Sequence, residues 1–469
     1  MKLYNYLAAG ILLTIVAAGC SVSKDIEKPA GVIPSAYRGS DSSDTASIAA
    51  IPVKELFKDP ELLLLIDSAL SRNFDLLLAV KNIEASSLLL KQARLGNVPA
   101  VNLQVTANSN RPSDNSLNGL SASQFLGTNH IEDFNAGLNL SWEADIWGKI
   151  RSQKQAALAE YLRTTEVKRA VQTRLVADVA QGYYQLLMLD AQLEVARKSY
   201  VLNDSTLNMV RLQFAAGQVT SLAVQQAAAQ QLLAAQLVPQ LEQAIQIREN
   251  ALRLLTGQLP GPVERSMNLA RTDIPVAASP GLPAQLLSRR PDIRSAELAL
   301  DVANARVGVA KANLYPSLNI SATGGLNAFK ASNWFNVPAS LFGVVSGGLV
   351  QPVLQRGALR TQYKLAGIER EKTVLLFRQS VLDAVAEVSD ELVKIEKLES
   401  QYDIVSKRVH TLQEAVSNAN LLFRNGMATY LEVITAQNNA LQSELELASV
   451  KTARLNAIVE LYRSLGGGV

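Results

Sequence analysis

The hexapeptide Leu70-Ser71-Arg72-Asn73-Phe74-Asp75 returns later in the chain as Leu287-Ser288-Arg289-Arg290-Pro291-Asp292, at a shift of 217 residues. The same shift carries Pro99 onto Pro316. After the stretches that follow these prolines the shift becomes 209, so the second copy has a loop that is shorter by 8 residues (217 − 209). Internal repetition of this kind marks a duplicated structural unit. The two halves of the chain are therefore predicted to share one fold.

At the shift of 209, the sequence Phe214-Ala215-Ala216-Gly217 becomes Phe423-Arg424-Asn425-Gly426, and Gly257 becomes Gly466. Each half reads as helix, strand, strand, long helix and helix, and the first helix is expected over residues 60–96. We divide the chain into a signal peptide, an N-terminal segment, a first repeat, a linker, a second repeat and a short tail. The signal peptide covers residues 1–19, the N-terminal segment 20–59 and the first repeat 60–257. The linker covers residues 258–282, the second repeat 283–466 and the tail 467–469.

Alternating apolar and small polar residues predict two strands in each repeat. They lie near residues 99–108 and 134–142 in the first repeat, and near 316–324 and 340–351 in the second. Segments of about 10 residues are long enough to cross a membrane when tilted. A soluble sandwich that buries one face of each strand would show the same alternation. The polar positions are Asn, Ser, Thr and Gln with almost no Lys or Glu, and this favours a wall between lipid and water.

Aromatic residues lie at both ends of the predicted strands. Trp142 and Trp147 are at one end of a hairpin, and Trp334 and Phe335 are in the opposite loop. Amphipathic rings at two ends suit two membrane interfaces. Four strands cannot close around a pore, and an open edge is not tolerated in lipid. We therefore predict a mixed α/β membrane protein in which several chains build one β-barrel.

Long helices are predicted over residues 149–214 and 357–423. At about 1.5 Å per residue, the first of them would be nearly 100 Å long. Between Lys149 and Phe214 there is no proline, and Gly182 is the sole glycine. Apolar residues recur at steps of four and three in both helices, and Glu391 is the one charged residue at the twelve such positions of the second. This spacing predicts helices that pack side by side, knobs into holes.

Each long helix is expected to reverse direction at a short turn. The turns are Gly217-Gln218-Val219-Thr220 and Gly426-Met427-Ala428-Thr429. Glycine supplies the left-handed residue that ends a helix, and Thr220 or Thr429 can cap the next one. These turns are the points farthest from the predicted strands, where a partner protein could bind. Ordinary helix-reversal chemistry accounts equally well for the glycines.

The N-terminus has the features of a bacterial lipoprotein signal. Lys2 precedes an apolar stretch over residues 7–18, and small residues precede Cys20, the sole cysteine of the chain. We expect cleavage before Cys20 and lipidation of its thiol. The alternative is an ordinary signal peptide beside a chance cysteine. The stretch is shorter than the ~20 residues that a membrane-spanning helix needs.

The composition argues against other classes of protein. With two histidines, His130 and His410, and one cysteine, a metal site or a histidine-based catalytic site is not expected. Neither a phosphate-binding loop nor a His-Glu-x-x-His motif occurs. The net charge is +3 and basic residues are interspersed with acidic ones, so nucleic acid is not an expected partner. We therefore expect that the protein binds no cofactor and is not an enzyme.

The duplicated pattern resembles the TolC family of outer-membrane efflux proteins, in particular its lipoprotein branch of the NodT type. The segments that carry the resemblance are Leu286–Asp292, Ala296–Glu297, Ala303–Pro316, Phe57–Leu62 and Trp142–Arg151, and the turn motif found in both halves. The resemblance implies a homotrimer with a twelve-stranded β-barrel in the cell outer membrane, continued by a long periplasmic α-helical barrel. It also implies a lipid anchor at Cys20, in contact with outer-membrane lipid.

The resemblance further implies two protein partners. The helix turns would contact a periplasmic adaptor (membrane fusion) protein, and the adaptor would couple the channel to an inner-membrane pump of the resistance–nodulation–division type. Such a system expels drugs, toxic small solutes or metal ions. A channel for type I protein secretion shares the fold and is the alternative. A structural coiled-coil lipoprotein is the third possibility, but it does not explain the four amphipathic strands.

The family closes its tunnel with inward carboxylates nine and six residues before the turn glycine. Here Ser417 and Asn420 hold those positions before Gly426, and Arg211 lies six residues before Gly217. The sequence therefore departs from an acidic, cation-binding constriction. We expect Arg211 and Arg424 to pair with neighbouring helices in a closing network. The alternative is that both are solvated arginines near a helix end, where a positive charge is favourable.

Overall fold

The computed structural model describes residues 34, 37–38, 47–274 and 280–468 of the chain. The predicted signal peptide and Cys20 lie outside these residues. The described chain divides into two compact units. The strand unit contains residues 84–162 and 298–375, and the helical unit contains residues 30–83, 163–297 and 376–469. Each unit takes segments from both repeats, so the repeats are not two separate domains.

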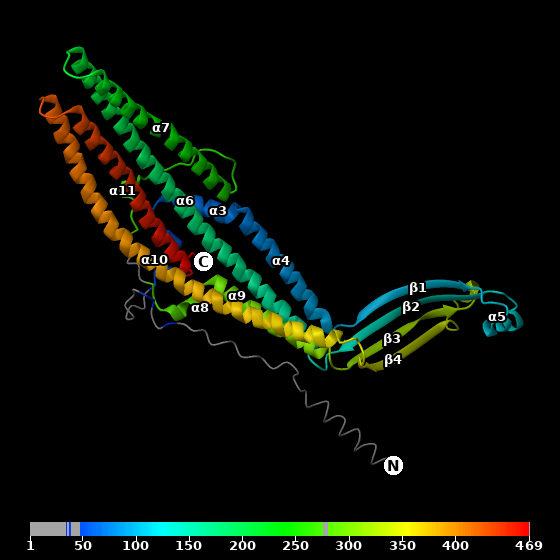
Figure 1. Ribbon diagram of the computed structural model, residues 1–469. Coiled ribbons are helices and arrows are strands. Elements are labelled where there is room, and N and C mark those ends of the chain that lie inside the picture. The colour runs from blue at the N-terminus through cyan, green and yellow to red at the C-terminus, as the bar shows by residue number, and fades with distance from the viewer. Residues whose placement is uncertain (1–33, 35–36, 39–46, 275–279, 469) are drawn as a thin grey trace. The chain divides into compact units, whose positions relative to one another are not determined.

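Four strands form one sheet in the strand unit (Figure 1). They are β1 (Ala100–Asn110), β2 (Ile131–Ala144), β3 (Ser317–Ala328) and β4 (Leu341–Val350). The order is β1-β2-β3-β4 and every neighbouring pair is antiparallel. The central pair joins β2 of the first repeat to β3 of the second, which is why the two repeats share one unit. The strands β1 to β3 extend beyond the ranges expected from the alternation.

The helices before the strands are interrupted in both repeats. The first repeat has α3 (Pro60–Arg72) and α4 (Phe74–Arg94), and the second has α8 (Leu286–Arg289) and α9 (Pro291–Ala312). The expectation of one helix over residues 60–96 was wrong, because Asn73 adopts an extended conformation. Its side-chain oxygen accepts a hydrogen bond of 3.1 Å from the Leu76 N–H. It thereby satisfies one of the free donors at the start of α4.

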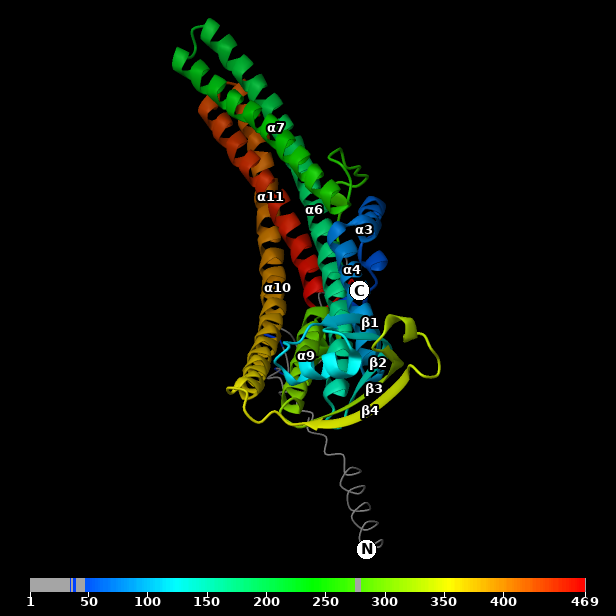
Figure 2. The ribbon, with the colours of Figure 1, turned by 90° about the vertical axis from the view of Figure 1, so that its right-hand side faces the viewer.

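Two pairs of long helices follow the strands. They are α6 (Lys149–Ala215) with α7 (Ser221–Leu255), and α10 (Ala358–Arg424) with α11 (Tyr430–Ser464). The members of each pair have the same lengths in both repeats, 67 and 35 residues. Figures 1 and 2 show the two hairpins side by side near their turns. Among the helices that the structure describes, none is both long and apolar enough to span a membrane.

The core of the helical unit lies where α6, α10 and α11 meet the short helices. Val179 and Leu186 of α6 and Ala384 and Val388 of α10 lie at the apolar positions that recur at steps of four and three, and all four are fully buried. At Gly182 an added Cβ would lie 2.7 Å from the Leu252 side chain, so glycine permits the close packing of α6 on α7. The remaining elements of the described residues are short: η1 (Ile48–Ala50), α2 (Val53–Leu56), η2 (Leu95–Asn97), α5 (Leu117–Ser121), the π-helix η3 (Ala122–Leu126), η4 (Leu269–Arg271), η5 (Pro283–Gln285) and η6 (Ala331–Asn333).

Candidate functional site

One face of the sheet is apolar on all four strands. Residues directly opposite each other on neighbouring strands share a face. Two rows of this face are Val105–Ala136–Leu326–Leu341 and Val101–Leu140–Ala322–Val345. The face is uncovered in the described chain, with Leu103 71% and Val345 80% exposed. A soluble sandwich would bury this face under a second sheet, but the described residues form one sheet only.

The opposite face carries amides and hydroxyls. Thr323 donates a hydrogen bond of 2.8 Å to Asn139 Oδ1, and the Asn139 amide donates one of 3.0 Å to Gln104 Oε1. Within the four strands, the charged residues of this face are Asp133 and Glu143, near the two ends of β2. Glu143 is paired with a lysine just beyond the strand, at 3.0 Å. The middle of this polar face is therefore uncharged.

Aromatic rings bracket the apolar face. Phe134 and Trp142 both point to this face, eight residues apart (142 − 134) on β2. Eight residues span about 27 Å along a strand, close to the ~25 Å height of the apolar band on a membrane barrel. Trp334 packs on Phe134 with ring centroids 5.4 Å apart, and it also contacts Phe335 at 5.1 Å. The indole N–H of Trp142 donates to the carbonyl of Asn97 at 2.9 Å.

Trp147 lies in a different environment from Trp142, Trp334 and Phe335. Its ring stacks on Tyr315 at 4.9 Å, and its indole N–H donates to the Pro316 carbonyl at 2.7 Å. It therefore ties the turn between β2 and α6 to the segment that leads into β3. The preceding Asp145 accepts hydrogen bonds of 2.9 Å from the backbone N–H groups of Ile150 and Arg151. This carboxylate caps the first turn of α6, where a negative charge is favourable.

The two helix turns have one geometry. Gly217 and Gly426 both have a φ of +73°, in the left-handed region. In each turn the N–H of the glycine and of the next residue bond back to the last helical turn, the arrangement of a Schellman motif. The turns differ in how the next helix begins. Glu432 accepts hydrogen bonds from the N–H and the hydroxyl of Thr429, at 2.7 and 3.0 Å. Thr220 makes no cap hydrogen bond through its side chain.

The structure brings both turns into one cluster. Buried side chains from α6, α7, α10 and α11 pack together next to the turns: Leu207, Val210, Ala223, Ala227, Phe423, Val433 and Ile434. Tyr430 donates a hydrogen bond of 2.6 Å to Gln226 across the two hairpins. Gln218 and Met427 remain exposed beside this cluster, whereas Val219 and Ala428 are half-buried and pack against it. The exposed residues of both turns therefore belong to one surface.

The candidate gate residues lie on the long helices before these turns. Ser417 is exposed, and the Asn420 amide donates to the Val416 carbonyl of its own helix at 2.9 Å. Arg211 and Arg424 are exposed, and neither forms an ion pair with a described residue of the same chain. A closing network through these two arginines would therefore need residues of another copy of the chain.

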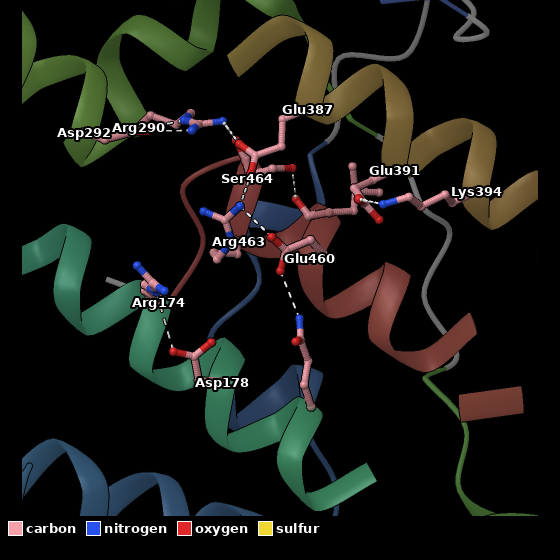
Figure 3. A network of polar contacts seen from close by, with 12 residues as sticks. Arg174, Asp178, Arg290, Asp292, Glu387, Glu391, Lys394, Glu460, Arg463 and Ser464 are labelled. Carbon is pink, nitrogen blue, oxygen red and sulfur yellow. Dashed lines mark hydrogen bonds and ion pairs between the residues drawn. The ribbon is translucent and has the colours of Figure 1, made fainter. Parts of the chain in front are cut away.

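Sequence reasoning missed a network of charged residues in the helical unit (Figure 3). Its first part is centred on the buried Arg290, whose guanidinium bonds to Asp292 at 2.6 Å and to Glu387 at 2.7 Å. It also donates to the Ser464 carbonyl at 2.9 Å. Burial tends to raise the pKa of Asp292, but the hydrogen bonds and charge of Arg290 outweigh it and hold this pKa below its usual value. The network connects the start of α9 to α10 and to the end of α11.

The second part of the network lines an open cavity of about 710 Å³ between α6, α10 and α11. The charged residues of this cavity are Arg174, Asp178, Glu391, Lys394, Glu460 and Arg463. Acids and bases pair with one another, as in the Glu391–Lys394 contact of 2.5 Å. Burial raises the pKa of Glu391, although Lys394 opposes this shift. Glu391, the one charged residue among the twelve recurring positions of this helix, was the signal in the sequence that could have pointed to this cavity.

The charges of the cavity balance, with three acids and three bases along its wall. Within the described residues, no group of three or more His, Cys, Asp or Glu side chains could hold a metal ion. Three charged residues of this network have no charged equivalent in the first repeat. The equivalents of Glu391, Glu460 and Arg463 at the shift of 209 are Gly182, Ala251 and Leu254. The network therefore joins charged residues that only the second repeat has to Arg174 and Asp178 on α6 of the first repeat.

Comparison with known proteins shows which family has this architecture. The family model described as outer membrane efflux protein matches twice, over residues 65–258 and 282–467. The solvent efflux pump outer membrane protein SrpC of Pseudomonas putida is 32% identical, over 97% of this chain and 96% of its own. The cation efflux system protein CusC of Escherichia coli O6:H1 is 26% identical, over 97% of both. A crystal structure of a membrane protein from Pseudomonas aeruginosa superposes with a TM-score of 0.86 at 27% identity, covering 95% of this chain and 100% of that one.

The duplicated fold and these matches place the protein among the TolC-like outer-membrane channels. The chain belongs to the outer membrane efflux protein family, and it is the outer-membrane component of an efflux system. The resemblance found in the sequence is confirmed. The family is one of channels and not of enzymes.

Proposed function

We propose that three copies of this chain form one passive exit channel, with twelve strands in a β-barrel that continues as an α-helical barrel in the periplasm. The two-faced sheet carries this proposal. Its apolar face, bracketed by aromatic rings, suits lipid, and its uncharged polar face suits a water-filled lumen. The outer edges of β1 and β4 have no partner strand among the described residues. Pairing β1 of one copy with β4 of the next would close the barrel and satisfy both edges.

We propose that the surface made by the two helix turns contacts a periplasmic adaptor, which couples the channel to an inner-membrane resistance–nodulation–division pump. The shared cluster beneath both turns supports this, because side chains of both hairpins pack in it and so bring the exposed residues of the turns onto one surface. The cargo would be drugs, toxic small solutes or metal ions that the pump delivers. The relatives named for solvent and cation efflux support this range. They favour it over type I protein secretion.

We further propose that the protein is anchored to the outer membrane by acyl chains on Cys20 and that it catalyses no reaction. Arg211 and Arg424, with Ser417 and Asn420, would close the periplasmic end through contacts between copies. Their exposure in the single chain leaves the arginines free to make such contacts. Substitution of either arginine by alanine would then raise the conductance of the channel in a planar bilayer. Unchanged conductance would count against the closing network.

The test of the proposed function is a mild cross-linking pull-down from native membranes, followed by mass spectrometry of the bound proteins. An adaptor and a proton-driven pump recovered with a trimer of this chain would support the proposal. An adaptor together with an ATP-binding-cassette exporter would make the channel a protein secretion duct. A chain that is monomeric in mild detergent and conducts no ions in a bilayer would overturn the channel itself.

A further inference from the structure

The fourth strand breaks the polar pattern of the proposed lumen face. On β1, β2 and β3 this face consists mainly of amides and hydroxyls, with Thr323 beside Asn139 as an example. On β4 the same face carries Phe342 and Val344, because they pair with Gly325 and Thr323. The other face of β4 is also apolar, as Val345 shows. A wall between lipid and water needs apolar residues only on the face toward the lipid. The apolar residues on the polar face of β4 therefore need another explanation.

Two glycines make room for the Phe342 ring on the polar face. The row that contains it reads Gln104–Gly137–Gly325–Phe342. At Gly325 an added Cβ would lie 2.2 Å from the Ala136 carbonyl oxygen, so no side chain fits there. The tip of the Phe342 ring lies 3.5 Å from the position of a Cβ on Gly137. The ring therefore reaches from β4 across β3 to β2, and it covers the sheet where side chains are missing.

Phe342 and Val344 with the two glycines form one apolar patch. Alternate residues of a strand are about 7 Å apart on one face, so the two side chains are neighbours. Val344 is 54% exposed. No charged residue of the four strands lies on this part of the polar face, since Asp133 and Glu143 are near the strand ends. A solute at this depth would meet either amides and hydroxyls or this patch.

We propose that this patch is a contact site for aromatic, amphipathic organic solutes as they pass through the lumen. The inference rests on the proposed function, because it requires the polar face to line a channel. Three copies would place three such patches at one height of the barrel. A flat ring can stack on Phe342 and release water from both surfaces, and an attached positive charge is attracted by the ring face. The uncharged surroundings add no competing ion pair.

The test is block of single-channel potassium chloride current in a planar bilayer by two cations of equal charge. Tetraphenylphosphonium offers aromatic rings, and tetramethylammonium does not. We expect tetraphenylphosphonium to block wild-type channels at a concentration at least about tenfold lower than tetramethylammonium does, because its rings can stack on Phe342. Val344→Thr keeps the shape of the side chain but replaces one methyl group with a hydroxyl. It should raise the blocking concentration of tetraphenylphosphonium by about threefold to fivefold. Thr323→Val, in the same row, should lower it.

Val345→Thr is the matched control, because it makes the same change on the next residue, which points to the opposite face. It should leave the block unchanged. Equal block by the two cations in a conducting wild-type channel would overturn the contact site while leaving the channel in place. A response to Val345→Thr but not to Val344→Thr would overturn it as well, because the apolar face would then line the lumen. A wild-type protein that conducts no potassium chloride would overturn the proposed function first.

Discussion

Asn73 and Arg290 make the same contact in the two repeats. They are equivalent at the shift of 217, and each side chain donates a hydrogen bond to the carbonyl near the end of the last helix, Leu255 at 3.0 Å and Ser464 at 2.9 Å. Leu255 and Ser464 are themselves equivalent at the shift of 209. The duplication therefore preserved the contact but not the residue that makes it. Arginine at the second position extends the contact to Asp292 and Glu387.

Arg290→Ala should destabilise the helical unit. It removes the donor to the Ser464 carbonyl and leaves Glu387 with one arginine partner, Arg463, instead of two. Loss of a hydrogen bond to a charged group costs on the order of 2–3 kcal/mol. Thermal unfolding followed by circular dichroism should show a lower midpoint. Arg289→Ala is the control, because Arg289 is exposed and should change the free energy of unfolding by less than about 0.5 kcal/mol. Equal midpoints for the two variants would contradict the prediction.

Asp292 should make the helical unit sensitive to acid. Because Arg290 lowers the pKa of Asp292 in the folded state, the stability gained from this carboxylate is present above its ordinary pKa of about 3.9. This stability is lost as the pH falls through the lowered value. Asp292→Asn should be less stable than wild type at pH 7 and should lose less stability between pH 5 and pH 2. Parallel pH profiles of the unfolding midpoint for both proteins would refute this.

Glu391 should have the opposite effect on the pH dependence of stability. Burial raises its pKa in the folded state, so the folded protein binds this proton more tightly than the unfolded chain. Its charged form then costs stability, and stability falls as the pH rises from the ordinary value of about 4.3 through the raised one. Glu391→Gln should therefore have a higher unfolding midpoint than wild type at pH 8, and the difference should shrink at pH 4. A lower midpoint at pH 8 would show that the Lys394 ion pair dominates.

Gly426→Ala should strain the turn between α10 and α11. Gly426 has a φ of +73°, and an added Cβ would meet no atom within 4 Å. The cost therefore comes from the left-handed backbone alone, about 1–2 kcal/mol. Amide hydrogen exchange in this turn should become faster. Gly426→Asn should lie between alanine and wild type, because asparagine tolerates this conformation better. Equal exchange in the two variants would argue against backbone strain as the cause.

Asp145→Ala should loosen the first turn of α6. The carboxylate accepts hydrogen bonds from two backbone N–H groups, and loss of such a cap costs about 1 kcal/mol. The equivalent residue of the second repeat at the shift of 209 is Leu354, which is 94% exposed. Leu354→Ala is therefore the matched control. Hydrogen exchange at Ile150 and Arg151 should increase in the first variant only, and an equal increase in both would rule out the cap.

Local sequence signals were sufficient for the four strands, the long helices and the faces of the sheet. Alternation over residues 101–107 is visible without any partner strand, because side chains of a strand point to opposite faces in turn. The glycines of the turns are equally local, since one residue with positive φ ends the helix whatever surrounds it. The break at Asn73 was missed. The helical periodicity continues on both sides of it, and the Asn73 side chain also bonds to Leu255, 182 residues away in the chain.

The sequence by itself determined the duplication, the strands, the long helices and the family, because each depends on residue order or on periodicity within one segment. Only the tertiary structure decided that β2 pairs with β3, so that one sheet contains strands from both repeats. It alone placed Phe342 over two glycines of neighbouring strands, and Arg290 between α9, α10 and α11. These contacts join residues that are distant in the chain. Their existence depends on register and packing, which no single segment contains.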